Sequence, residues 1–199
     1  MCAWHGKKII GLTGNIATGK SVVLKMLEQL GAFGIDADAL AHTAILKGAP
    51  AYQPILDTFS TEILREDGEI DRSKLANKVF SNPVALVTLE RIVHPVVEKM
   101  VDELVTNLNQ DVVILEAIKL IESGLINYCD SLWVTDASQE VQISRLIEQR
   151  GMSLQVALQR IKAQPPQDEK LARADVIIRN DGSLEDTWQQ VISAWQMGS

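Results

Sequence analysis

The 199-residue chain has only two cysteines, Cys2 and Cys129, and no apolar run long enough to cross a membrane. Two cysteines do not make a disulfide framework, so we interpret them as free thiols in a reducing compartment. A spanning helix requires about 20 consecutive apolar residues, and residues 1–8 are too few and too polar for a signal peptide. These shortages predict a cytoplasmic protein.

The chain also has an excess of negative charge and few aromatic residues. Its 26 acidic and 19 basic residues give a net charge of −7, which disfavours general binding to nucleic acids or to membrane surfaces. Hydrophobic residues make up 46% and charged residues 23%, as in an ordinary soluble protein with a core. We therefore expect small-molecule partners rather than nucleic acid or membrane.

Short apolar runs alternate with amphipathic segments. Residues 7–13 and 32–35 predict two strands around a helix at 21–30, and this order indicates a parallel pair with a right-handed crossover. The whole alternation predicts an α/β fold with a parallel sheet covered by helices. Further strands are expected at 111–117, 131–134 and 175–179, and further helices at 52–59, 72–80, 139–149, 153–163 and 184–195.

Residues 14–21 (GNIATGKS) fit the pattern G-x-x-x-x-G-K-[ST] between a predicted strand and a predicted helix. In such a loop, backbone N–H groups surround the phosphates of a nucleotide, and the following helix presents its positive end to them. Lys20 supplies a charge to the phosphates and Ser21 offers a hydroxyl to Mg²⁺. The alternative is a structural turn with an exposed lysine. The predicted ATP-binding residues are Gly14, Asn15, Ile16, Ala17, Thr18, Gly19, Lys20, Ser21 and Val22.

The rest of the chain narrows the class of P-loop protein. A GTPase carries an Asn-Lys-x-Asp guanine-binding motif, whereas the pair Asn77-Lys78 is followed by valine and phenylalanine. Motor-type ATPases end an apolar strand in Asp-Glu, whereas the strand at 111–117 carries only Glu116 there. A small-molecule kinase is favoured, and we expect a P-loop kinase-type sheet with a helical substrate-side insertion and a helical lid.

Two carboxylates are candidates for the acceptor side. Asp36 and Asp38 follow the second predicted strand, which we expect beside the P-loop strand, at the end where α/β sheets bind ligands. If extended, the two side chains would project to the same side. One would accept the hydroxyl proton while the other supports Mg²⁺ through water. A pair of turn-forming aspartates is the alternative.

The segment 145–179 is locally basic in an acidic chain. It contains seven of the 19 basic residues against four acidic ones, and such a segment is typical of a lid that closes arginines over phosphates. For any single arginine a solvated helix face is the alternative. The basic residues are Arg145, Arg150, Arg160, Lys162, Lys170, Arg173 and Arg179.

The order of these motifs resembles the dephospho-CoA kinase family over nearly the whole chain. The D-A-D, His-Pro and R-I-x-A-Q elements carry this resemblance more specifically than the phosphate loop does. The matching positions are 11–14, 19–21, 36–38, 68, 70–72, 75, 80, 92, 94–95, 120–125, 145–146, 150, 160–161, 163–164, 174–175 and 180.

The resemblance implies ATP- and Mg²⁺-dependent phosphorylation of the ribose 3′-hydroxyl of dephospho-CoA, the last step of coenzyme A synthesis. It implies Asp38 as the catalytic base beside Asp36, Arg150 as a lid arginine, and Asn180 near the adenine. His42 and His94 are expected on the CoA side, where packing alone is the alternative for His94. The implied parts are a nucleotide-binding core (7–38, 110–138 and 174–197), a helical CoA-side domain (39–109) and a lid (139–173).

The chain also departs from the family pattern. Asn15 and Ala17 stand where glycine is common, His42 where arginine is common, and Lys119 in a segment that usually reads Pro-Leu-Leu. Two alternatives stay open: a kinase for another small acceptor, such as a nucleoside monophosphate, and a nonenzymatic nucleotide-binding switch. A monomer is favoured, although the sequence does not determine the oligomeric state.

Overall fold

The computed structural model describes residues 6–80 and 82–198. Cys129 is present as a thiol, whereas Cys2 lies outside the described residues. The chain divides into two compact units. We call Met1–Ile35 with Asn109–Ser199 the sheet unit, and Asp36–Leu108 the helical unit.

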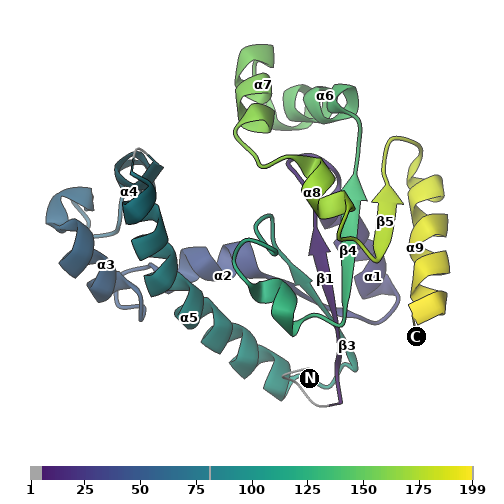
Figure 1. Cartoon of the computed structure of the whole chain (residues 1–199), viewed down its shortest axis with the longest axis horizontal. Coiled ribbons are helices and arrows are strands. Elements are labelled where there is room, and N and C mark those ends of the chain that lie inside the picture. The colour runs from purple at the N-terminus through teal and green to yellow at the C-terminus, as the bar shows by residue number, and fades with distance from the viewer. Residues whose placement is uncertain (1–5, 81, 199) are drawn as a thin grey trace. The chain divides into compact units, whose positions relative to one another are not determined.

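A five-stranded sheet with the order β2-β3-β1-β4-β5 forms the centre of the sheet unit (Figure 1). The β1–β3, β1–β4 and β4–β5 pairs are parallel, with Ile10 opposite both Ile114 and Ser131. This arrangement confirms the expected α/β class. The strands are β1 (Lys8–Thr13), β2 (Phe33–Asp36), β3 (Val112–Glu116), β4 (Ser131–Asp136) and β5 (Val176–Arg179).

The expectation that the first two strands are neighbours was wrong, because β3 lies between β1 and β2. Burial gives the physical reason. Val113, Ile114 and Leu115 in β3 are at most 1% exposed, as in a strand covered on both faces, so β3 is interior. In β2, Phe33 is half-buried and Asp36 is exposed, which suits a short strand at the sheet edge.

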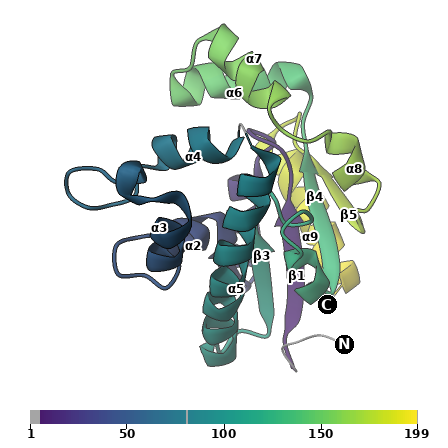
Figure 2. The same cartoon turned by 60° about the vertical axis from the view of Figure 1, so that its left-hand side comes forward.

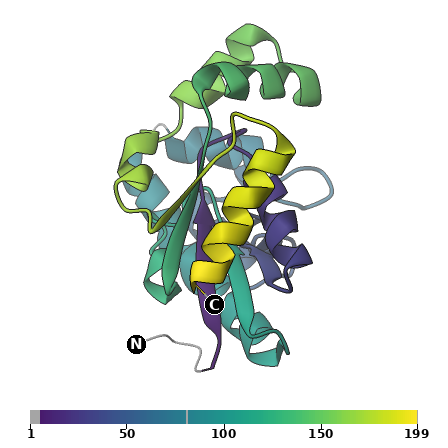
Figure 3. The same cartoon turned by 90° about the vertical axis from the view of Figure 1, so that its right-hand side faces the viewer.

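Helices flank the sheet of this unit, and α1 and α8 lie on opposite faces (Figure 3). Leu12, Val23, Ile114, Trp133 and Val191 belong to one buried cluster that joins α1 and α9 to the strands. Ser138 and Ser153 cap the starts of α6 and α7. The helical elements are α1 (Lys20–Gln29), η2 (Leu125–Tyr128), α6 (Gln139–Arg150), α7 (Leu154–Lys162), α8 (Gln167–Leu171) and α9 (Leu184–Gly198).

The helical unit is built around α5, its longest helix (Figure 2). The buried side chains of α5 recur every four residues, at Val97, Val101 and Val105. Asp71 caps α4, since its Oδ1 accepts hydrogen bonds from the backbone N–H groups of Ser73 and Lys74. The elements are α2 (Ala37–Ala44), α3 (Tyr52–Phe59), η1 (Thr61–Ile63), α4 (Arg72–Phe80) and α5 (Pro83–Asn107).

Candidate nucleotide-binding site

The loop between β1 and α1 requires glycine at both ends of its motif. Gly14 and Gly19 have φ of +149° and +100°, values that other residues rarely adopt. A Cβ on Gly14 would lie 2.6 Å from the carbonyl oxygen of Thr135, and one on Gly19 would overlap the side-chain amide of Asn180. In the described chain no side chain caps α1, so the positive end of that helix is available to an anion.

Lys20 is buried within this loop rather than exposed to solvent. Its side chain is held by the Gly14 carbonyl, which accepts a hydrogen bond from Nζ at 2.9 Å, and Nζ lies 3.9 Å from Glu116 Oε1. Lys20 is 8% exposed, as is Glu116 at the end of β3. Glu116, which in the sequence served only as evidence against a motor-type ATPase, therefore stabilises Lys20 in the loop. Ser21 is exposed in the first turn of α1.

Thr18 and Asn180 form further hydrogen bonds that hold the loop. Thr18 Oγ1 lies 2.8 Å from Asn15 O and 2.7 Å from Thr135 Oγ1. Asn180 donates from Nδ2 to Thr18 O at 3.0 Å, and its Oδ1 accepts from Thr187 Oγ1. Asn180 is 2% exposed, so in this structure its side chain supports the loop. Its implied place near adenine stays a prediction.

Arg145 of α6 also contacts the loop. Its Nη1 donates to Ala17 O at 3.0 Å, and its Nη2 donates to Asn180 O at 2.6 Å. One guanidinium thus joins the phosphate loop to the end of β5. Arg150, at the last position of the same helix, is exposed to solvent.

Two glutamine side chains accept hydrogen bonds from the backbone of the loop. The backbone N–H of Ile16 donates to Gln164 Oε1 at 2.7 Å, and that of Asn15 donates to Gln167 Oε1 at 3.1 Å. Gln167 also donates to Thr135 O at 2.8 Å, which ties the same contact to the end of β4. Gln164 ends the R-I-x-A-Q motif, whereas no sequence pattern pointed to Gln167.

Lys170 contacts the loop through Asn15 and is 2% exposed. Its Nζ donates to Ile118 O at 2.7 Å and to Asn15 Oδ1 at 3.1 Å. Asn15 in turn donates to Pro165 O at 3.0 Å. One of the seven basic residues that suggested a lid is therefore buried against the loop. Asn15, which stands where the family commonly has glycine, joins the loop to Lys170 and Pro165 through its side chain. We refer to Gln164, Gln167 and Lys170 as the brace.

Asp36 and Asp38 do not project from one extended strand, so that expectation was wrong. The strand ends at Asp36, whose Oδ1 caps α2 by accepting from Ala39 N at 2.8 Å. Asp38 is half-buried in the first turn of α2. The helix begins there because an aspartate at the N-cap satisfies a free N–H of the first turn.

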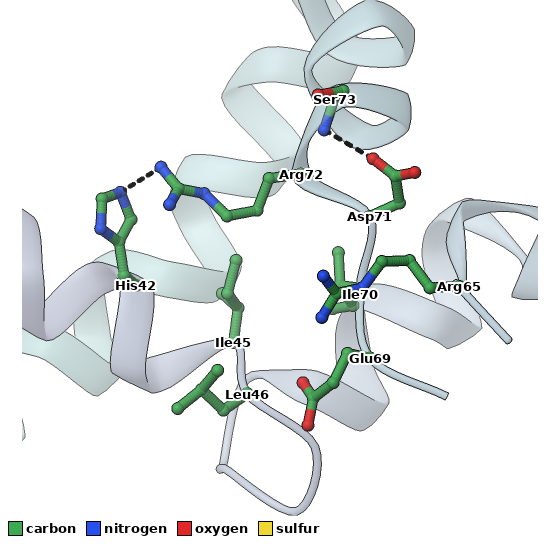
Figure 4. Close-up of a pocket in the computed structure, with 9 residues that line it drawn as sticks. All are labelled: His42, Ile45, Leu46, Arg65, Glu69, Ile70, Asp71, Arg72 and Ser73. Carbon is green, nitrogen blue, oxygen red and sulfur yellow. Dashed lines mark hydrogen bonds between the residues drawn. The ribbon is translucent and has the colours of Figure 1, made fainter. Parts of the chain in front are cut away.

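His42, in the last turn of α2, lines a cavity of about 290 Å³ in the helical unit (Figure 4). Arg72 Nη2 donates to His42 Nε2 at 2.6 Å. A guanidinium can only donate, so the ring nitrogen is the acceptor of this hydrogen bond. His94 lies half-buried in α5 next to Pro95 and is not among the cavity-lining residues.

Asp181, next to Asn180, links the end of β5 to the start of α6. Its carboxylate accepts a hydrogen bond from the Ser138 backbone N–H at 2.6 Å. This bond, together with the Ser138 hydroxyl, Arg145 and Arg179, holds the pKa of Asp181 below its usual value.

The described residues contain no cluster of three or more His, Cys, Asp or Glu that could hold a metal ion. Mg²⁺ nevertheless fits the loop chemistry, because it keeps several waters and needs few protein ligands beside phosphate oxygens. The exposed hydroxyl of Ser21 is a ligand of the required kind.

None of the described helices is both long and apolar enough to span a membrane.

The family model described as dephospho-CoA kinase matches residues 8–186. The dephospho-CoA kinase of Carboxydothermus hydrogenoformans is 43% identical over 94% of this chain and 93% of its own length. That of Aquifex aeolicus is 44% identical over 95% and 96%.

Solved structures agree with these matches. Dephospho-CoA kinase from Campylobacter jejuni has a TM-score of 0.68 and 30% identity, covering 97% of this chain and 98% of its own. TT1252 from Thermus thermophilus has a TM-score of 0.85 and 34% identity, covering 96% and 97%. Shikimate kinase from Acinetobacter baumannii, at 17% identity and a TM-score of 0.54 over 99% of this chain and 97% of its own, shares the fold alone.

Proposed function

Because the chain belongs to the dephospho-CoA kinase family, we propose that it transfers the γ-phosphoryl group of ATP to the ribose 3′-hydroxyl of dephospho-CoA. The products are coenzyme A and ADP, and the reaction is the last step of coenzyme A synthesis. Membership confirms the resemblance that the motifs carried. The observation that supports this function most strongly is the family match over residues 8–186, which contains the complete phosphate loop.

On the ATP side, residues 14–22 bind the phosphates. The backbone N–H groups of Asn15 and Ile16 donate to the brace, so the donors to phosphate are other N–H groups of the loop and of the first turn of α1. Lys20 neutralises charge on the transferred group, and its burial beside Glu116 holds it at the loop. Arg150 reaches the phosphates when residues 139–173 close as a lid, and Asn180 lies near the adenine. When bound, Mg²⁺ offsets phosphate charge, and Ser21 is its ligand from this chain.

On the acceptor side, Asp38 accepts the proton of the 3′-hydroxyl, and Asp36 lies next to it in the chain. Asp38 is the better candidate for the base by its place in the D-A-D motif, whereas the Asp36 carboxylate caps α2. His42 and His94 contribute to binding dephospho-CoA within a helical domain at 39–109. Residues 7–38, 110–138 and 174–197 form the nucleotide-binding core. We propose a cytoplasmic monomer, and the net charge of −7 disfavours a nucleic-acid or membrane partner.

A coupled ADP-release assay across acceptors tests this function. We expect ADP release with dephospho-CoA to exceed release with AMP, with shikimate or without acceptor by at least ~100-fold, because only the correct acceptor is positioned for transfer. Lys20→Ala should weaken ATP binding and transfer together. Turnover of a nucleotide but not of dephospho-CoA would refute the proposal, and acceptor-independent release alone would favour a nonenzymatic switch.

A further inference from the structure

The cavity around His42 is lined by two arginines and by two carboxylates, Glu69 and Asp71, in an acidic part of the molecule. Residues 36–108 contain 12 acidic and seven basic residues. Two of those basic residues, Arg65 and Arg72, line this one cavity. Figure 4 shows Arg72 reaching from the start of α4 to the His42 ring, and the Arg65 side chain directed into the same space.

Arg72 forms its side-chain hydrogen bond with a group that carries no negative charge. Its hydrogen-bond partner is a neutral ring nitrogen of His42, and no carboxylate of the described residues forms an ion pair with it. Arg65 is 3.4 Å from Asp67, but both side chains are more than half exposed, so water screens this pair.

The two carboxylates that line the cavity are occupied by backbone groups. Glu69 Oε2 accepts from Lys47 N at 3.0 Å, and Asp71 Oδ1 accepts from the N–H of Ser73 at 2.9 Å. These acids partly offset the arginines across the cavity, yet among the described residues neither forms an ion pair with a guanidinium. The guanidinium groups therefore remain available to an anionic ligand.

The size of the cavity limits which anion fits. A volume of about 290 Å³ is at the lower end of ligand pockets, so it suits a fragment of a ligand rather than a whole nucleotide. Two guanidinium groups match two adjacent phosphates, which they bind by paired N–H donors. Ile45, Leu46 and Ile70 supply apolar wall beside them.

We propose that this cavity binds the diphosphate of dephospho-CoA, with Arg72 and Arg65 as its ligands and His42 as the residue that orients Arg72. The inference rests on the proposed function, because it takes the acceptor to be dephospho-CoA. It assigns the acceptor a binding contact separate from the phosphate loop. It also gives His42, which departs from the family pattern, a role as a positioning residue.

The test compares two acceptors in the full-length enzyme. Dephospho-CoA carries both the 3′-hydroxyl and the diphosphate, whereas adenosine carries a 3′-hydroxyl without phosphate. Arg72→Gln and Arg65→Gln should each raise the KM for dephospho-CoA by roughly 10- to 100-fold, the range of a lost hydrogen bond to a charged group. The KM for ATP and the slow turnover of adenosine should stay within about twofold of the wild type, a margin well below one such bond.

Further variants separate binding from folding. His42→Ala should raise the KM for dephospho-CoA with little change in kcat, and His42→Gln, which keeps an acceptor, should restore part of the loss. Arg91→Gln removes an exposed charge from the same unit outside the cavity and serves as the matched control. An unchanged KM in Arg72→Gln, or an equal loss with both acceptors, would overturn the diphosphate site. Failure of the wild type to phosphorylate dephospho-CoA would instead overturn the proposed function.

Discussion

Replacing Gln167 with alanine removes the side-chain amide that joins the phosphate loop to β4. That amide accepts from the Asn15 N–H at 3.1 Å and donates to Thr135 O at 2.8 Å. Asn15 is 7% exposed, so water does not readily replace the lost partner. The substitution should leave one buried donor unsatisfied while shortening only one side chain.

An unsatisfied buried N–H costs about 1–3 kcal/mol. In a chain of this length each kcal/mol lowers Tm by about 2–4 °C, so the Tm of Gln167→Ala should be roughly 2–12 °C lower than that of the wild type. The loop would also have to become ordered when ATP binds, and a cost of about 1.4 kcal/mol raises the Kd tenfold. We therefore expect ATP to bind about tenfold more weakly, without a comparable loss in kcat.

Calorimetry with ATP and thermal unfolding without ATP measure the two effects separately. Gln159→Ala is the control, because it is the same substitution at an exposed position of α7 that is not part of the brace. Gln164→Ala should lower the Tm and weaken ATP binding in the same way, because it removes the acceptor of the Ile16 N–H. If Gln167→Ala lowered Tm but kept the Kd for ATP within twofold of wild type, the brace would be structural only, and the reasoning about loop order would be refuted.

Three further outcomes are expected. Asp38→Asn should bind ATP normally but transfer phosphate ~100-fold more slowly or worse, the scale of losing a positioned base; near-normal turnover would remove Asp38 from that role. Ala17 has a φ of +60°, so Ala17→Gly relieves about 1 kcal/mol of left-handed strain, offset by the entropy of glycine, and thermal unfolding should show little change. Ala163→Gly, at a φ of −78°, has no strain to relieve and should lose about 0.5–1 kcal/mol; an equal loss at both positions would contradict this account. The pKa of Asp181 is lower in the folded protein than its ordinary value of 3.8. Its ionised carboxylate therefore stabilises the fold fully at any pH above 3.8, and this stabilisation is lost as the pH falls through the lower pKa of the folded state. Denaturant unfolding should show a smaller free energy of unfolding for Asp181→Asn than for the wild type at pH 7. If this difference persisted at a pH below the pKa of the folded state, the charged bond to Ser138 would not be its cause.

Local pattern predicted most elements closely. The helices at 52–59 and 72–80 begin and end as expected, since their apolar spacing, and the Asp71 cap of the second, are properties of neighbouring residues. Short strands also followed their apolar runs. The strand order did not, because pairing joins residues as far apart as Ile10 and Ser131, and only the burial of β3 reveals its interior place.

The nucleotide site shows the same division between local and long-range information. The glycines, Lys20 and Ser21 could be predicted because their spacing alone makes a phosphate loop. Lys170 was counted among lid charges because a lysine in a basic segment is normally solvated, and only the tertiary contact with Asn15 shows it buried. Glu116 likewise showed its role beside Lys20 only in three dimensions.

The sequence by itself determined the fold class, the phosphate loop and the family, because each depends on residue types at short, ordered spacings. Only the tertiary structure decided what holds that loop in shape and which charges face one another. Gln167 meets Asn15 across 152 residues, and His42 meets Arg72 across 30. Such contacts depend on how distant segments pack, and packing is a property of the whole folded chain rather than of any local pattern.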